Sequence, residues 1–494
     1  MPEESYRTDA DVSRRSYLGV GGALAALSFA PVGGAADDRG DERGRPADSS
    51  DRILIENGTV VTVDPDLGTL EDADVLIEDG RIEAVDRGID AEGVERIDAS
   101  DAIVAPGFVD AHLHAWQAGV RGVASDWSFM EYLDLMLGEV SAHYEPADVY
   151  LGNLFGALEQ LNAGVTTILD WFHVANSPGH TNRAIDALED AGIRAVFAHG
   201  PPGDDSDLWW EESTEPHPDD VRRLADERFP TDDGLLTLAL GIRGPDYSTA
   251  EVTAHDIELA RELGVPASMH IGSLGPGGVE TLEELDLLGP DLNYVHGNRL
   301  TAEEFALIGE SGGSVTTTPE VEMQMGMGMP PLRETLEAGA IPSIGVDIVS
   351  NVSGDMFTQT RFALQTQRAL DNQPTVEAGE QLEDVSLTAR QALEFATIDG
   401  ARALGLEDEI GSLTPGKRAD VVLVRTGDVN TTPVHDPVET LVFQASVAAV
   451  DTVLVDGEIR KRHGDLRNET GRTRREQLVR SGRRVLERGG VLER

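Results

Sequence analysis

Apolar and polar positions divide the chain into two kinds of segment. From residue 53 to 104, and again from 419 to 464, short runs rich in β-branched residues alternate with polar turns. We therefore predict β-structure near both ends of the chain, and the two segments can combine into one small domain. Hairpin turns between such runs are predicted at Asn57-Gly58, Asp79-Gly80 and Asp456-Gly457.

The long middle of the chain alternates apolar strands with helical stretches. Thr301 and Glu304 form a capping box at the start of one of these helices. Eight strand–helix units with continuous apolar strands predict the α/β class, as a closed (β/α)8 TIM barrel. An open doubly wound sheet is the alternative, but no GxGxxG turn follows a strand here. The eight strands are predicted at 107–114, 164–171, 193–200, 235–242, 265–272, 292–298, 314–320 and 341–347.

The N-terminal segment has the pattern of an export signal. Arg14 and Arg15 precede a weakly apolar run that is too short for a transmembrane helix. The pair resembles a twin-arginine signal, so we expect an exported protein on the extracellular or cell-surface side, without a membrane anchor. The whole chain is predicted to contain a signal peptide (1–36), a disordered linker (37–51), a β-sandwich in two parts (52–105 and 406–463), the barrel (106–405) and a basic C-terminal helix or tail (464–494).

Composition narrows the chemistry and the partners. The chain has no cysteine, so any metal must be held by His, Asp or Glu. Its 90 acidic and 39 basic residues give a net charge of −51, which disfavours nucleic acid and anionic membranes as partners. Because the acids are spread over the whole chain, we interpret them as an adaptation to high salt rather than as an acidic binding face.

Five side chains converge at the predicted strand ends. His112 and His114 alternate at the end of the first barrel strand and therefore project to the same side. His270, His296 and Asp347 end the fifth, sixth and eighth strands. Catalytic groups of such barrels lie at this edge. A single strand-end histidine is more often a core residue, but four imidazoles and a carboxylate together predict a site for Zn²⁺ or Fe²⁺.

The ordered motifs "PGFVDAHLH", "MHIG", "YVHGN" and "IGVD" resemble the amidohydrolase superfamily, and most closely its branch of cytosine deaminases and triazine chlorohydrolases. The resemblance covers residues 53–463. It implies a metal-bearing barrel with a small β-sandwich built from both chain ends. It further implies that one divalent ion is held by His112, His114, His270 and Asp347, with His296 beside the bound water.

The resemblance also indicates how hydrolysis proceeds. A divalent ion lowers the pKa of its water to about 7 and so makes hydroxide available. Asp347 can take the proton of that water, and His296 can stabilise the charge that develops as the hydroxide attacks an sp² carbon. Deaminases of this branch carry a glutamate three residues after the strand-five histidine, where this chain has Ser273. Glu320 or Glu322 could replace that proton shuttle; the alternative is that both are solvated loop acids.

Three residues of the first loop are candidates for substrate binding. A flat heterocycle could be held by stacking and edge hydrogen bonds from Trp116, Gln117 and Arg121. The alternative for Trp116 is that it packs the loop onto the barrel. The run "MQMGMGMPP" is either a substrate-facing loop or a gap-filling turn.

From the sequence we expect a metal-dependent amidohydrolase that cleaves a C–N bond, other than a peptide bond, in a cyclic or amidine-like small molecule. Three alternatives stay open: removal of halide from a heteroaromatic ring, ring opening of a cyclic amide, and a non-catalytic metal-binding barrel. For the oligomeric state we consider a homodimer, because two copies of a barrel of this kind often associate.

Overall fold

The computed structural model describes residues 52–203 and 212–492. The predicted signal peptide (1–36) and linker (37–51) lie outside the described residues. Within the described part, no helix combines the length and the apolar character needed to cross a lipid bilayer.

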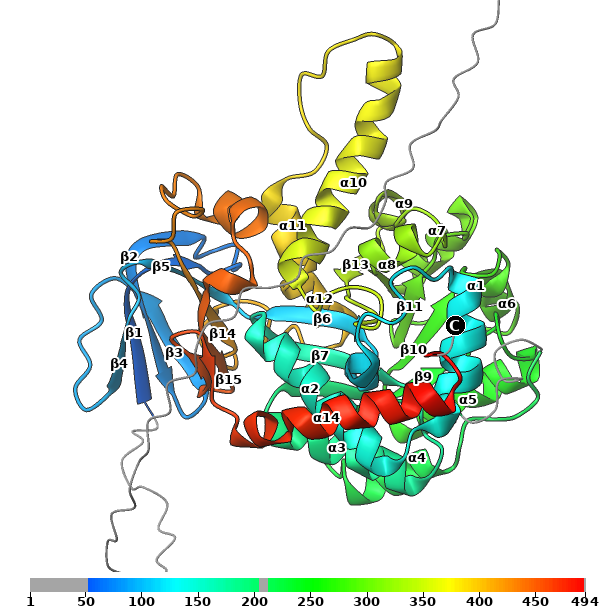
Figure 1. Cartoon of the computed structure of the whole chain (residues 1–494). Helices are drawn as coiled ribbons and strands as arrows, with labels where there is room; N and C mark the ends of the chain where they lie inside the picture. Colours follow the sequence, from blue (N-terminus) through cyan, green and yellow to red (C-terminus); the bar gives the residue numbers. More distant parts are fainter. Residues whose placement is uncertain (1–51, 204–211, 493–494) are drawn as a thin grey trace, which may run out of the picture. The chain divides into compact units, whose positions relative to one another are not determined.

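Eight parallel strands follow one another around a barrel, each hydrogen-bonded to the next (Figure 1). A bridge between Leu113 and Asp347 joins the last strand region to the first. The predicted (β/α)8 barrel is therefore confirmed, and all eight predicted strands are present. They are β6 (Phe108–Leu113), β7 (Val165–Phe172), β8 (Arg194–His199), β9 (Leu236–Ile242), β10 (Ala267–Ile271), β11 (Leu292–His296), β12 (Ser314–Thr317) and β13 (Ile341–Ile344).

Helices lie between successive barrel strands. The first connection is the most elaborate, because four short helical segments precede its long helix: η1 (Ala115–Val120), α1 (Phe129–Tyr132), η2 (Leu133–Val140), η3 (Ser141–His143) and α2 (Pro146–Asn162). The predicted capping box of Thr301 and Glu304 is confirmed at α7. The later helices are α3 (Pro178–Ala191), α4 (Asp220–Glu227), α5 (Ala250–Leu263), α6 (Gly278–Glu284), α7 (Ala302–Ser311), α8 (Pro319–Gln324), α9 (Leu332–Ala338), α10 (Met356–Glu377), α11 (Ala389–Phe395) and α12 (Ile398–Ala403).

A second, mixed sheet is built from both ends of the described chain. Strand β5 pairs with β1 on one side and with β14 on the other, which confirms the predicted joint β domain. Its buried side chains form a hydrophobic cluster separate from that of the barrel. The strands are β1 (Arg52–Val61), β2 (Thr69–Glu78), β3 (Arg81–Asp86), β4 (Glu95–Asp98), β5 (Ala102–Pro106), β14 (Val421–Arg425), β15 (Val450–Val455), β16 (Glu458–Arg462) and β17 (Asp465–Leu466); α13 (Pro437–Glu439), η5 (Thr440–Gln444) and η6 (Val447–Ala449) lie between β14 and β15.

Two of the three predicted hairpin turns are confirmed. Asp79-Gly80 joins β2 to β3 and Asp456-Gly457 joins β15 to β16, with positive φ at all four residues. The turn predicted at Asn57-Gly58 is wrong. Strand β1 runs straight through that pair, and the register shifts there because the residues form a β-bulge.

A buried ion pair links the barrel to the mixed sheet. Arg194, at the start of β8, donates two hydrogen bonds of 3.0 Å to the carboxylate of Asp420, next to β14. Both side chains are almost fully buried. A charge in that position is stable only while its partner is present, so the pair ties the two sheets to each other.

The C-terminal helix α14 (Glu469–Arg488) packs along α2 and η1 (Figure 1). The buried carboxylate of Asp148, on α2, accepts hydrogen bonds from Ser481 and Arg484. Arg488 adds an ion pair to Glu145 at 2.7 Å. The basic helix is therefore docked against acids of the barrel's first connection.

Candidate active site

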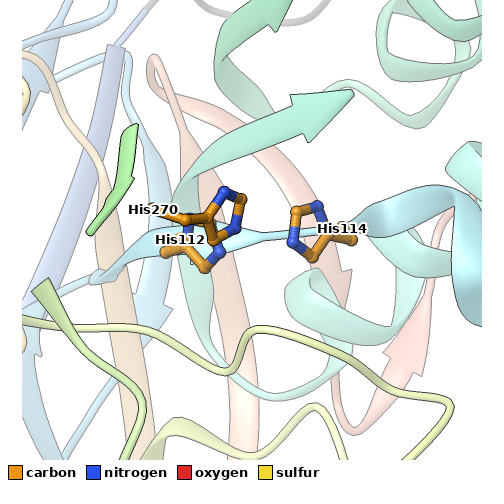
Figure 2. Close-up of side chains that lie close together, drawn as sticks. All are labelled: His112, His114 and His270. Atoms are coloured by element: carbon orange, nitrogen blue, oxygen red, sulfur yellow. The ribbon is translucent and has the colours of Figure 1, made fainter. Parts of the chain in front are cut away.

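The strand-end histidines and Asp347 meet at one point. Figure 2 shows His112 on β6 and His114, directly after that strand, beside His270 on β10. The Nε2 atoms of His112 and His114 lie 3.5 and 3.4 Å from Asp347 Oδ1. His296, at the end of β11, places Nε2 4.0 Å from Asp347 Oδ2. Donor atoms of His112, His114 and His270 lie within 4.8 Å of one another, as do those of His112, His296 and Asp347.

This donor set fits a divalent ion. Neither ring nitrogen of the buried His112 has a hydrogen-bond partner among the described residues. Burial lowers the pKa of His114 to about 3, so its imidazole is neutral, the form that binds metal. Three imidazoles and one carboxylate match the ligand preference of Zn²⁺ or a similar ion. The residues that would hold the ion are His112, His114, His270 and Asp347.

Neighbouring groups hold the ligands in place. His114 Nδ1 donates to the carbonyl of Trp171 at 2.6 Å, which leaves Nε2 facing Asp347. The ring of His173 stacks on that of His114, with centres 4.1 Å apart. Asp110 accepts hydrogen bonds from the backbone N–H groups of Val346 and His112. It thus fixes the chain on both sides of the site.

His296 is held by a carboxylate. Its Nδ1 lies 3.2 Å from Oε1 of Glu322, which is fully buried in α8 and also accepts the backbone N–H of Thr318. Burial opposes protonation of His296, but the bond to Glu322 and the charge of Asp347 outweigh it and raise the pKa of the imidazole. Glu322 therefore orients Nε2 of His296 toward Asp347 and favours positive charge on the ring.

The backbone is strained at two site residues. His296 has φ of 76° and Asp347 has φ of 69°, the left-handed region that side chains other than glycine rarely adopt. Such conformations cost roughly 1–3 kcal/mol each and concentrate at functional sites. Hydrogen bonds between the backbones of His112, His114 and Asp347 help to maintain the geometry at the second of these positions.

A cavity opens onto this cluster, with about 420 Å³ of empty space that includes the part open to solvent. Its polar lining, apart from the metal-site residues, consists of Tyr132, His173, Tyr247 and Ser273. Among the described residues, no lysine or arginine lines it, and Asp347 supplies its carboxylate. The rest of the wall is apolar: Phe129, Leu133, Leu137, Val321, Met325, Met327 and Ile348. The methionine-rich run thus faces the cavity.

The three first-loop candidates do not line the cavity. Trp116 and Gln117 are fully buried behind it. Arg121 forms an ion pair with Glu159 at 2.6 Å at the partly exposed surface of the barrel. Their predicted roles in direct substrate contact therefore have no support in the cavity lining.

The two acids after β12 also differ in position. Glu322 contacts His296, whereas Glu320 accepts a hydrogen bond from Gln359 of α10 at 2.8 Å. Neither of them lines the cavity. Sequence reasoning missed Tyr132 and Tyr247 as cavity residues, since neither stands at a strand end or in a recognised motif. The capping box of Ser128 and Glu131 was a signal for the short helix that ends at Tyr132.

Known proteins are similar to this chain in sequence and in fold. Residues 103–460 match the family model described as "Amidohydrolase family". A 5′-deoxyadenosine deaminase from Methanosarcina mazei is 30% identical over 82% of this chain and 92% of its own. A zinc-bound adenosine deaminase from Xanthomonas campestris has a TM-score of 0.75 and 27% identity, covering 89% of this chain and 98% of its own. The zinc-bound atrazine chlorohydrolase of Arthrobacter aurescens TC1 has a TM-score of 0.75 and 25% identity, covering 88% of this chain and 100% of its own. The branch predicted from the motifs is confirmed.

Proposed function

Since this chain belongs to the amidohydrolase family, we propose that it removes ammonia from the amidine carbon of a neutral, adenine-sized amino-heterocycle. The protein is a metal-dependent hydrolase of C–N bonds other than peptide bonds. The observation that carries the finer assignment is the cavity, which joins the His–Asp cluster to a mainly apolar wall without lysine or arginine among the described residues. The names of the relatives, which include several adenosine-type deaminases, support the same class.

Zinc is the ion that we propose for the site. Two similar structures were described with zinc, and the imidazole–carboxylate donor set suits it. When bound there, the ion supplies Lewis acidity and promotes ionisation of water at neutral pH.

The chain's own residues transfer the protons, stabilise the developing charge and exclude bulk water. Water adds to the amidine carbon, and its oxygen becomes the carbonyl oxygen of the product as the C–N bond to the amino group breaks. Asp347 accepts one proton from the water and passes it to the departing amine, which leaves as ammonia, while the second proton of the water ends on the adjacent ring nitrogen of the amidine. His296, held by Glu322, stabilises the negative charge on the oxygen that adds to the amidine carbon. The apolar wall excludes bulk water from the reacting groups.

Removal of halide from a heteroaromatic ring is the second candidate. Ser273 occupies the cavity at the position where deaminases of this branch carry a proton-shuttling glutamate. A halide leaves as an anion and needs no proton, so its loss tolerates a serine there.

Metal analysis and product assays test the proposal. The full chain would be purified in high salt, its metal content measured by plasma mass spectrometry, and its release of ammonia from 5′-deoxyadenosine, adenine and cytosine compared with release of chloride from atrazine. About one zinc per chain is expected, with ammonia released from at least one amine.

Three variants control that experiment. His270→Ala and Asp347→Ala remove ligands, so both should lose metal and turnover. Arg121→Ala changes a residue of the same region off the cavity and should retain both. A metal-free wild type would count against the hydrolase mechanism, and chloride release without ammonia release would favour the second candidate.

A further inference from the structure

We infer that the hydroxyl group of Tyr132 donates a hydrogen bond to a ring nitrogen of the substrate, and that Gln117 and Ser350 fix its direction. The inference rests on the proposed function, because it names an interaction of the same site. Tyr132 lines the cavity, while Gln117 and Ser350 lie behind it and are fully buried.

A chain of two hydrogen bonds ends at the tyrosine. Ser350, three residues after Asp347, donates through Oγ to Oε1 of Gln117 at 2.5 Å. Gln117 donates through Nε2 to the hydroxyl oxygen of Tyr132 at 2.6 Å. Because the serine occupies the amide oxygen, the amide presents its N–H to the tyrosine. The phenolic oxygen is therefore the acceptor in this bond, and its own proton is available in another direction.

The surroundings of Tyr132 keep that proton in place. Burial, and then the negative charge of Asp347, raise the pKa of the phenol well above its ordinary value. The group thus remains a neutral donor at physiological pH. Tyr132 and Asp347 both line the cavity, so a substrate bound at the metal-site residues shares this cavity with the phenol.

A parallel arrangement supports the same interpretation. The indole N–H of Trp116 donates to Nδ1 of His173 at 3.0 Å, which places the proton of the neutral imidazole on Nε2. Trp116 and Gln117 are neighbours in sequence, and each bonds one polar group of the cavity lining from behind. The pair thus fixes the orientation of two polar side chains that line the cavity.

Calorimetric binding to the zinc-loaded protein tests the inference, with ammonia assayed at the end of each titration so that binding is separated from turnover. The probes are adenine and its 1-deaza, 3-deaza and 7-deaza analogues, each of which replaces one ring nitrogen by a C–H group. In the wild type, one analogue is expected to bind about 3–10-fold more weakly than adenine, as for the loss of one neutral hydrogen bond. Tyr132→Phe should weaken the binding of adenine by a similar factor. It should also abolish the difference in affinity between adenine and that analogue.

Two further variants separate donation from packing. Tyr144→Phe removes another buried phenol that lies off the cavity, and it should leave all four dissociation constants unchanged. Gln117→Met keeps the side-chain volume but releases Tyr132, so discrimination between the purines should fall while zinc content stays constant. For whichever amine is hydrolysed, Tyr132→Phe should raise KM more than it lowers kcat.

Equal binding of adenine to the wild type and Tyr132→Phe would overturn the inference, as would unchanged discrimination in the variant. A wild type that binds none of the four purines would also overturn it. Failure of the proposed function has a different signature, in which no ammonia is released although the binding pattern holds.

Discussion

Two glutamates separated by one residue have different roles in this structure. Glu322 is buried and orients His296, whereas Glu320 is bonded to Gln359 on the neighbouring helix α10. Their spacing in sequence made them equal candidates for the missing proton shuttle. Their environments assign Glu322 to the support of His296.

Exchange of each acid for its amide tests this distinction. Glu322→Gln is expected to lower kcat about 10–100-fold, since the hydrogen-bond partners that orient active-site groups typically contribute that much. Glu320→Gln should stay within about twofold of the wild type, because its partner lies off the cavity. Steady-state kinetics with the amine identified above measures both. Equal losses in the two variants would contradict the assignment.

A third acid, Asp246, lies beside the loop that carries Ser273. Burial raises the pKa of this carboxyl to about 6, although it accepts backbone N–H groups from Gly272, Ser273 and Leu274. The folded state therefore retains a proton that the unfolded state loses near pH 3.8. The contribution of Asp246 to stability is present at low pH and is lost as the pH rises through 6.

Asp246→Asn should remove this dependence. The free energy of unfolding of the variant relative to the wild type should increase between pH 4 and pH 7 by up to about 3 kcal/mol and then level off. Urea unfolding at several pH values measures the difference. A flat profile for Asp246→Asn would disprove the prediction.

At the scale of elements, η1 is held between two helices by glycines. A side chain at Gly152 or Gly156 of α2 would overlap the backbone of Trp116 or Ala115. On the opposite side, a methyl group at Gly482 of α14 would overlap the carbonyl oxygen of Gly119. The close approach of three backbones places the Trp116–Gln117 pair behind the cavity.

Gly482→Ala is expected to displace α14 from η1. Its helix-propensity gain of about 1 kcal/mol is outweighed by the overlap with a backbone atom, which has no rotamer by which to move aside. The melting temperature should fall, and hydrogen exchange should increase in residues 115–143. Gly471→Ala, on the same helix, meets side-chain atoms of Leu158 and Asn468 rather than backbone and is the matched control. Unchanged exchange in Gly482→Ala would contradict the model of a clamped segment.

At the scale of the whole molecule, the net charge of −51 opposes compaction. The Debye length falls from about 10 Å at 0.1 M salt to about 3 Å at 1 M, so added salt screens the repulsion between exposed carboxylates. Buried pairs such as Arg194–Asp420 are screened much less.

We therefore expect the melting temperature of the full chain to rise between 0.1 and 2 M KCl. Differential scanning calorimetry measures it, and equal concentrations of sucrose control for general solute effects. A melting temperature that is constant or falls with KCl would argue against adaptation to high salt.

The sequence predicted the barrel and the cluster because both follow from local patterns. Strand ends fix where His112, His270 and Asp347 lie once eight strands close, and each stands at the end of an unambiguous apolar run. Loop residues lacked that constraint. The chemistry of Trp116 and Gln117 predicted contact with the substrate. Packing of η1 against α2 and α14 instead buries both side chains behind the cavity lining.

The pairing of β5 with β14 has a consequence for how the chain folds. Residues 102–106 pair with residues 421–425, which are synthesised more than 300 positions later. At synthesis rates of about 5–20 residues per second, the open edge of β5 is unpaired for roughly 15–60 s on the ribosome. The mixed sheet thus closes only near the end of translation, whereas each barrel strand meets its neighbour soon after it emerges. Sheet closure is the late, non-local step of folding, and a chain interrupted before residue 421 exposes a strand edge open to aggregation.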